Sequence, residues 1–325
     1  MRVLRFVASV AVLVLVMAAV VAFLVVKGPP SEQELLERAG LTDKLELRIG
    51  VKDDVPGVAL RDADTGQFSG FDIDIAYMVA SDLGFRRSQV HFYPIEPEDR
   101  SKMQARDGNR FVTVDLVVST YSITEEREKL PRVTFSAPYL LTEQSVVTIE
   151  GHSTVQSLED LRGEAVCTLG TSTSQTAVAK AGANVFGKNR LSECFTGLRS
   201  GQFEAVTTDA AMLAGFVATD PLQRLQHHDI GLEAVEAWGI NTGGNEDLRT
   251  LVNLSLYRSL HNPNDPRWEE AFDRNLRHEQ PVNLPQEIAE EHQPDVDPVR
   301  VRQWPWDRDK FPPAEPAQPA PSTSR

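Results

Sequence analysis

Short apolar runs alternate with helix-like stripes over residues 45–277, and this alternation limits the possible folds more than any other feature of the chain. Residues 45–51, LELRIGV, are typical of a buried strand, and residues 71–84 place apolar side chains at helical spacing before Gly84. The other expected strands are 89–95, 114–119, 144–149, 164–169 and 203–208, and the other expected helices are 171–182, 194–201, 209–218, 246–260 and 266–277. Strands that alternate with helices predict parallel sheets covered on both faces. The pattern occurs twice, before and after residue 146, so we expect an α/β protein with two lobes.

Polar side chains follow three of the expected strands. The three clusters are Thr120 with Ser122, Thr168–Thr173, and Thr207–Asp209. Ligands of open α/β sheets bind beyond the carboxyl ends of the strands, and helix starts rich in hydroxyl groups can hold an anion. The alternative is that each cluster only caps the next helix. Ser122 or Thr124 opens the next helix, and Ser122 with Glu125 fits a capping box; on this reading Arg127 is a solvated helix residue.

An uncharged run of 21 residues, 6–26, lies near the start of the chain and is long enough to span a bilayer. Arg2 and Arg5 precede the run, Lys27 follows it, and the chain then turns acidic from Glu32. This charge bias favours a cytoplasmic N-terminus and an extracytoplasmic body. We expect residues 1–27 to be a membrane anchor or uncleaved signal, followed by a linker over 28–43. A cleaved signal peptide, which would release a secreted protein, is the alternative.

Cys167 and Cys194 are the two cysteines of the chain. In an exported protein a disulfide between them is expected, whereas in a cytosolic protein two buried thiols are expected. Residues 281–325 are rich in Pro, Glu, Gln and Ser, which predicts a disordered tail.

Several kinds of partner are disfavoured by the sequence. The formal net charge of −14 and the lack of a basic stretch weigh against nucleic acid. Residues 182–189 nearly match a phosphate loop, but Asn189 replaces the required hydroxyl and the segment follows a helix, so we interpret the match as coincidence. The seven histidines include no pair spaced by four residues, so we expect neither a metal site nor a cofactor.

Four segments carry a resemblance to a known family. They are LRIGVKDDVPGVALRDADTGQFSGFDIDIAYMVASDLG, VDLVVSTYSITEEREKLPRVTFSAPYL, LEDLRGEAVCTLGTSTSQ and FEAVTTDAAMLAG. The body resembles the amino-acid-binding solute-binding proteins of ABC transporters (family 3), particularly the glutamate/glutamine branch of actinobacteria. The resemblance implies a bilobed type II periplasmic-binding-protein fold, with two parallel-sheet lobes joined by a two-strand hinge near 146–150 and 234–240. Lobe 1 is expected over 44–146 plus 238–280, and lobe 2 over 147–237.

The resemblance also implies roles for individual residues. Arg127 matches the arginine that binds the ligand α-carboxylate, a pairing for which the planar guanidinium is better suited than lysine. Asp209 matches the carboxylate that binds the α-ammonium group. Arg100 matches a position at which binders of acidic amino acids use arginine for the side-chain carboxylate. The alternative is that Arg100 lies on the surface of a helix and does not contact the ligand. The other implied ligand-binding residues are Thr120, Ser122, Thr168 and Thr171.

The function implied is extracytoplasmic binding of an L-amino acid by a monomer, for delivery to an ABC permease in the membrane. Glutamate is the first expectation, followed by glutamine or aspartate, and no catalysis is expected. One alternative is a membrane-tethered sensor that signals to a partner protein. A remote alternative is an enzyme resembling cyclohexadienyl dehydratase, with Asp53 or Asp54 as general acid. The chain departs from the family at 104–118, where extra residues predict a longer surface loop, and at 52–57, which lacks the aromatic residue that many members place over the ligand.

Overall fold

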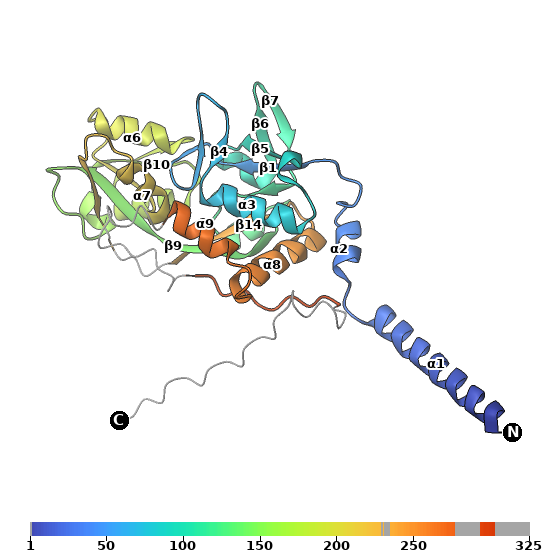
Figure 1. Cartoon of the computed structure of the whole chain (residues 1–325). Helices are drawn as coiled ribbons and strands as arrows, with labels where there is room; N and C mark the ends of the chain where they lie inside the picture. Colours follow the sequence, from blue (N-terminus) through green and yellow to red (C-terminus); the bar gives the residue numbers. More distant parts are fainter. Residues whose placement is uncertain (1, 229, 231–234, 277–292, 303–325) are drawn as a thin grey trace, which may run out of the picture.

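The computed structural model describes residues 2–228, 230, 235–276 and 293–302, and the structural statements that follow concern these residues (Figure 1). Nine of its strands form the main sheet, in the order β11-β10-β12-β9-β14-β8-β1-β5 with β13 paired to β9, and two small sheets, β2-β3-β4 and β6-β7, lie apart from it. A mixed sheet with helices packed on it confirms the predicted α/β class.

Lobe 1 is built around parallel strands β5, β1 and β8, with β14 and the first part of β9 antiparallel beside them. Its main strands are β1 (Leu47–Val51), β5 (Val90–Pro94), β8 (Leu116–Val117), β9 (Phe135–Ile149) and β14 (Val235–Asn241). Its covering helices are α3 (Phe71–Asp82), α8 (Glu246–His261) and α9 (Arg267–Asn275). Stacked and edge-to-face rings of Phe71, Trp268 and Phe272 hold α3 against α9.

Lobe 1 also contains several short strands and helices. The short strands are β2 (Asp54–Val55), β3 (Ala59–Arg61), β4 (Phe68–Ser69), β6 (Gln104–Asp107) and β7 (Arg110–Thr113), and the short helices are η1 (Arg87–Gln89), η2 (Pro97–Lys102) and α4 (Glu125–Glu128). The loop that we expected from the extra residues at 104–118 is a β6–β7 hairpin that rises above the sheet in Figure 1.

Lobe 2 continues the sheet with parallel strands β11, β10 and β12. Its strands are β10 (Ala165–Leu169), β11 (Asn184–Lys188), β12 (Ala205–Asp209) and β13 (Leu225–His228), and its helices are η3 (Leu158–Leu161), α5 (Thr173–Ala181), α6 (Leu191–Arg199) and α7 (Ala210–Ala218). The expected disulfide is confirmed, since Cys167 of β10 is bonded to Cys194 of α6.

The strand that crosses between the lobes is β9. Glu143 still pairs with Val235 of β14, whereas the next residue, Gln144, pairs with Asp209 of β12. The crossing therefore lies slightly before the segment 146–150 that we expected. The second expected crossing, near 234–240, follows residues 231–234, which lie outside the described residues. From Val235 onward the chain is already β14, which pairs with β9 and β8 in lobe 1.

The segment expected to be a linker contains helix α2 (Glu32–Arg38), which Ser31 caps by accepting from the Glu34 amide at 3.2 Å. Leu35 is buried in the core of lobe 1, and Glu32 forms an ion pair with Arg258 of α8 at 2.6 Å. Before it lies helix α1 (Arg2–Lys27), which points away from the body in Figure 1. Within the residues that the structure describes, no helix is both long enough and apolar enough to cross a membrane.

Part of the tail that we expected to be disordered is packed on lobe 1. Val296 and Val301 are buried in its core, and Arg302 forms an ion pair with Glu34 at 2.6 Å. The remainder of the expected tail, 281–292 and 303–325, lies outside the described residues.

Candidate ligand-binding site

Arg127 connects the two lobes. Its helix α4 is capped by Thr124, whose hydroxyl accepts from the Arg127 amide at 3.2 Å, so the capping box at Ser122 is wrong. Ser122 instead forms a backbone bridge to Trp238. The Arg127 guanidinium donates to the carbonyl of Ser122 at 2.7 Å and to that of Thr171 in lobe 2 at 3.0 Å. Arg127 is therefore directed inward and is not a solvated helix residue.

Arg100 is a buried cation, only 3% exposed, which rules out the surface alternative. Its Nε and Nη1 donate to three backbone oxygens, those of Pro97, Ser119 and Thr120. No oxygen in the described part of the chain accepts from its Nη2. The Arg100 and Arg127 guanidinium carbons lie 4.5 and 4.8 Å from the ring centre of Tyr121, so the two cations share one aromatic ring.

Neither Arg100 nor Arg127 forms an ion pair with a carboxylate among the described residues. Burial, and then the charge of Arg127, lower the pKa of Arg100 to about 9, so Arg100 stays charged at neutral pH. Burial also lowers the pKa of Arg127. A buried charge without a counter-ion is costly, and an anionic ligand would remove that cost.

Asp209 supplies the negative charge of the site. It precedes α7 but makes no cap, and its carboxylate accepts from Trp238 Nε1 at 2.5 Å. Burial and then Glu236 raise the pKa of Asp209 to about 7, while the Trp238 hydrogen bond and the nearby charges of Arg127 and Arg100 oppose that rise. A cationic group beside Asp209 would favour its charged form.

Thr120 has a left-handed backbone conformation (φ 45°) and is bound by Asp72, a residue that the sequence analysis missed. Its amide donates to Asp72 Oδ2 at 3.1 Å, and the Tyr139 hydroxyl donates to Asp72 Oδ1 at 2.8 Å. The Thr120 amide is therefore occupied, whereas its buried hydroxyl has no partner among the described residues. Asp72 is one of two acidic residues in the first turn of α3, next to Asp74, and of the two it is the fully buried one.

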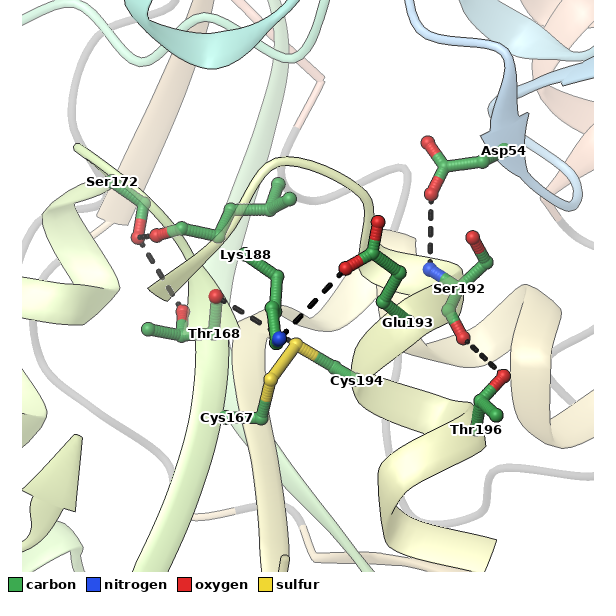
Figure 2. The surroundings of a disulfide bond; sticks show 10 residues. Asp54, Cys167, Thr168, Ser172, Lys188, Ser192, Glu193, Cys194 and Thr196 are labelled. Carbon is green, nitrogen blue, oxygen red and sulfur yellow. Dashed lines mark hydrogen bonds and ion pairs between the residues drawn. A yellow bond between two sulfur atoms is a disulfide. The ribbon is translucent and has the colours of Figure 1, made fainter. Parts of the chain in front are cut away.

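Of the hydroxyl-bearing residues in the two lobe 2 clusters, some adjoin Arg127 and others only stabilise lobe 2. Ser172 caps α5 by accepting from the Gln175 amide at 3.0 Å, and Thr168 is buried with its hydroxyl 3.4 Å from that of Ser172 (Figure 2). Thr171 offers its carbonyl to Arg127. Thr207 is turned away, since its hydroxyl donates to the Ser145 carbonyl at 2.8 Å.

Arg127, Arg100 and Asp209 thus come together from three separate stretches of chain, with Thr120, Ser122 and Thr171 adjoining the guanidinium groups. The arrangement offers two cations, one anion and a free hydroxyl, which suits a small molecule carrying both signs of charge. No group of three or more His, Cys, Asp or Glu side chains within the described ranges is placed to hold a metal ion.

Comparison with known proteins identifies the family of the chain. Residues 47–280 match the family of bacterial extracellular solute-binding proteins, family 3. The chain is 32% identical over 240 residues to the ABC transporter glutamine-binding protein GlnH of Bacillus subtilis (strain 168), covering 73% of this chain and 83% of that protein. It is 33% identical over 177 residues to the glutamate-binding protein GluB of Corynebacterium efficiens, covering 52% of this chain and 58% of that protein. An ancestral arginine-binding protein bound to glutamine shares the fold with a TM-score of 0.62 at 30% identity, covering 71% of this chain and 97% of that structure. The chain belongs to the family 3 bacterial extracellular solute-binding proteins, which bind amino acids for ABC transporters.

Proposed function

We propose that L-glutamate is the preferred ligand of this amino-acid-binding protein, with glutamine and aspartate bound more weakly. The observation that carries the proposal is the charge of the site: Arg100 and Arg127 against Asp209. Glutamate carries two carboxylates and one ammonium group, so each of its charges would meet one opposite charge. Glutamine would leave one buried guanidinium without a counter-ion, which is unfavourable.

The proposed orientation of the ligand follows from the hydrogen-bonding atoms that each side chain does not use within the described protein. Arg127 would bind the α-carboxylate through the guanidinium hydrogens not used by backbone carbonyls. Asp209 would bind the α-ammonium group, and the Thr120 hydroxyl would bind a ligand oxygen. Arg100 Nη2 would bind the side-chain carboxylate. Ser122, Thr168 and Thr171 would form the surrounding wall.

Replacing Arg100 with alanine tests the choice of ligand. If Arg100 binds the side-chain carboxylate, Arg100→Ala should weaken glutamate far more than glutamine, because the neutral amide needs no cationic partner. Loss of a buried charge partner costs about 2–5 kcal/mol, so the ratio of the two dissociation constants should change by roughly 30-fold or more. Isothermal titration calorimetry on wild type and variant gives that ratio.

Arg106→Ala is the matched control for this experiment, because Arg106 stacks on Phe111 in the exposed β6–β7 hairpin. It should leave the ratio unchanged. An unchanged ratio in Arg100→Ala as well would mean that Arg100 does not read the ligand side chain, and the preference for glutamate would then be lost.

We infer binding without catalysis. The two acids considered for a dehydratase, Asp53 and Asp54, are both engaged: Asp53 pairs with Arg190 at 2.8 Å, and Asp54 accepts from the Ser192 amide at 2.9 Å. A general acid needs a proton directed at its substrate, and neither carboxylate has that geometry.

We further propose that the protein acts as a monomer with an extracytoplasmic body, held at the membrane by residues 6–26 and partnered by an ABC permease. The support is the uncharged run itself. A tethered sensor is the second candidate, favoured by the docking of α2 on α8 directly after that run. N-terminal sequencing of membrane-extracted protein should find the chain starting at its first residues, whereas a start near Phe23 would show that the segment is cleaved.

A further inference from the structure

Three consecutive side chains of lobe 1 reach across to lobe 2 just after strand β1. Lys52 Nζ donates to the Asn189 carbonyl at 2.9 Å. Asp53 forms an ion pair with Arg190 at 2.8 Å. Asp54 Oδ2 accepts from the Ser192 amide at 2.9 Å. The partners all lie within residues 189–192, so two short segments far apart in sequence are joined at one place.

Helix α6 begins without a cap of its own. Its N-cap residue, Arg190, makes no side-chain cap bond, and Asp54 of lobe 1 supplies the acceptor that the first turn lacks (Figure 2). The first amides of a helix need an outside acceptor, and a carboxylate at that end is stabilising. Asp54 is buried, and Lys52 lies 3.4 Å from its other oxygen. The start of α6 is therefore completed by the opposite lobe.

Helix α7 of lobe 2 also packs closely against the segment 52–57 of lobe 1. A Cβ added at Gly215 of α7 would lie 2.0 Å from the carbonyl oxygen of Pro56. Val55 between these contacts is fully buried. Residues 52–57 therefore fit between α6 and α7, and only glycine at 215 permits this approach.

The disulfide connects this contact to the wall of the ligand site. Cys194 lies in α6, a few residues beyond Ser192, and Cys167 lies in β10 directly before Thr168 (Figure 2). The start of α6 and the Thr168 strand end are thus held in one covalent unit. Movement of one relative to the other is restricted.

We propose that residues 52–57 and 189–192 form a closure latch, a set of contacts between the lobes that stabilises the closed state. The latch would set how long a bound ligand is retained. The inference rests on the proposed function, because it concerns the same site between the lobes. Hinge closure is the usual motion of periplasmic binding proteins. Contacts present only when the lobes meet raise the closed population, and apparent affinity scales with that population.

A latch predicts a distinctive pattern of affinities. Asp54→Ala should raise the dissociation constants for glutamate and for glutamine by the same factor, about 2- to 30-fold, the range for loss of a helix cap. Their ratio should stay constant, unlike the ratio in Arg100→Ala. Because Asp54 is buried, Asp54→Asn serves as the conservative variant, and it should recover part of the loss by keeping an acceptor.

Asp53 and Arg190 form an ion pair of partly exposed side chains, so they allow a double-mutant cycle. Asp53→Asn and Arg190→Gln should each speed ligand dissociation by about 2- to 5-fold, the range for a partly exposed ion pair. The double variant should be no worse than either single one. Lys188→Gln is the matched control, because Lys188 pairs with Glu193 inside lobe 2 at 3.9 Å.

Gly215→Ala tests the steric part of the latch. Alanine favours the helix of α7 itself, so lobe 2 should fold, whereas the new Cβ would meet Pro56 of lobe 1. This variant should raise both dissociation constants more than Asp54→Ala. An unchanged affinity in Gly215→Ala would contradict the close approach of the two lobes.

A measurement without ligand separates the latch from the proposed function. Spin labels on Asn109→Cys and Lys180→Cys, both exposed, report the distance between the lobes of the full chain. Latch variants should shift the distances to longer values than in wild type, even if glutamate is not the ligand. Unchanged distances together with unchanged dissociation rates would overturn the latch, and failure of wild type to bind amino acids would overturn only the proposed function.

Discussion

Replacing Arg127 with alanine should abolish measurable amino-acid binding while the protein stays folded. The ligand α-carboxylate would lose its partner in a desolvated site, at a cost of about 2–5 kcal/mol, or roughly 30- to several-thousand-fold in affinity. Folding should survive because Arg127 donates only to two backbone carbonyls and lies at a short, partly exposed helix. Calorimetric titration with glutamate and with glutamine measures the loss for both ligands.

Two variants sharpen this test. Arg127→Lys keeps the charge but cannot form two parallel hydrogen bonds, so it should recover only part of the affinity. Lys129→Ala removes a cation at the end of the same short helix, where Lys129 pairs with Glu125 at 3.8 Å, and it should change nothing. Near-native affinity in Arg127→Ala would remove Arg127 from the site.

Replacing Asp209 should have a comparable effect through the opposite charge. Asp209→Ala removes the partner of the α-ammonium group, with an expected loss of about 2–5 kcal/mol in binding free energy for either ligand. Asp209→Asn is the sharper variant, because its amide oxygen can still accept from Trp238 while the charge is gone. Binding lost in both variants, with an unchanged melting temperature in Asp209→Asn, would assign the effect to charge.

The raised pKa of Asp209 adds a pH dependence with a definite sign. In the unliganded protein burial holds the pKa of Asp209 at about 7, and an ammonium group beside it would lower that pKa. Binding below pH 7 must then release a proton, so affinity should fall with decreasing pH, by up to about tenfold per unit. Titrations in buffers of different ionisation enthalpy would detect the proton, and a pH-independent affinity between pH 5 and 8 would contradict the pairing.

Regular elements with strong periodicity were predictable from the sequence, because their side chains face one core. The helix expected at 71–84 is α3 (Phe71–Asp82), and the strand expected at 164–169 is β10 (Ala165–Leu169). By contrast, β11 (Asn184–Lys188) escaped notice because this edge strand is mostly exposed and contains a glycine. Helix α2 escaped because most of its residues are charged and it depends on docking against α8.

The site itself was predictable only in part. Arg127 and Asp209 were assigned their roles by resemblance, and the contacts that they make in the structure depend on tertiary packing that no local pattern contains. Arg127 meets the Thr171 carbonyl of the other lobe, and Asp209 meets Trp238. Similarly, the segment 52–57 differed from the family at sequence level, and only the assembled lobes show its contacts with α6 and α7.

The most direct test of the account is a calorimetric titration of the wild-type chain with L-glutamate and two of its analogues. Glutarate keeps both carboxylates but lacks the ammonium group, and γ-aminobutyrate lacks the α-carboxylate. If Arg127, Asp209 and Arg100 each bind one charge of the ligand, glutamate should bind with one site per chain and both analogues should be at least about 30-fold weaker. Glutarate or γ-aminobutyrate binding as tightly as glutamate, or no binding of glutamate at all, would contradict the account.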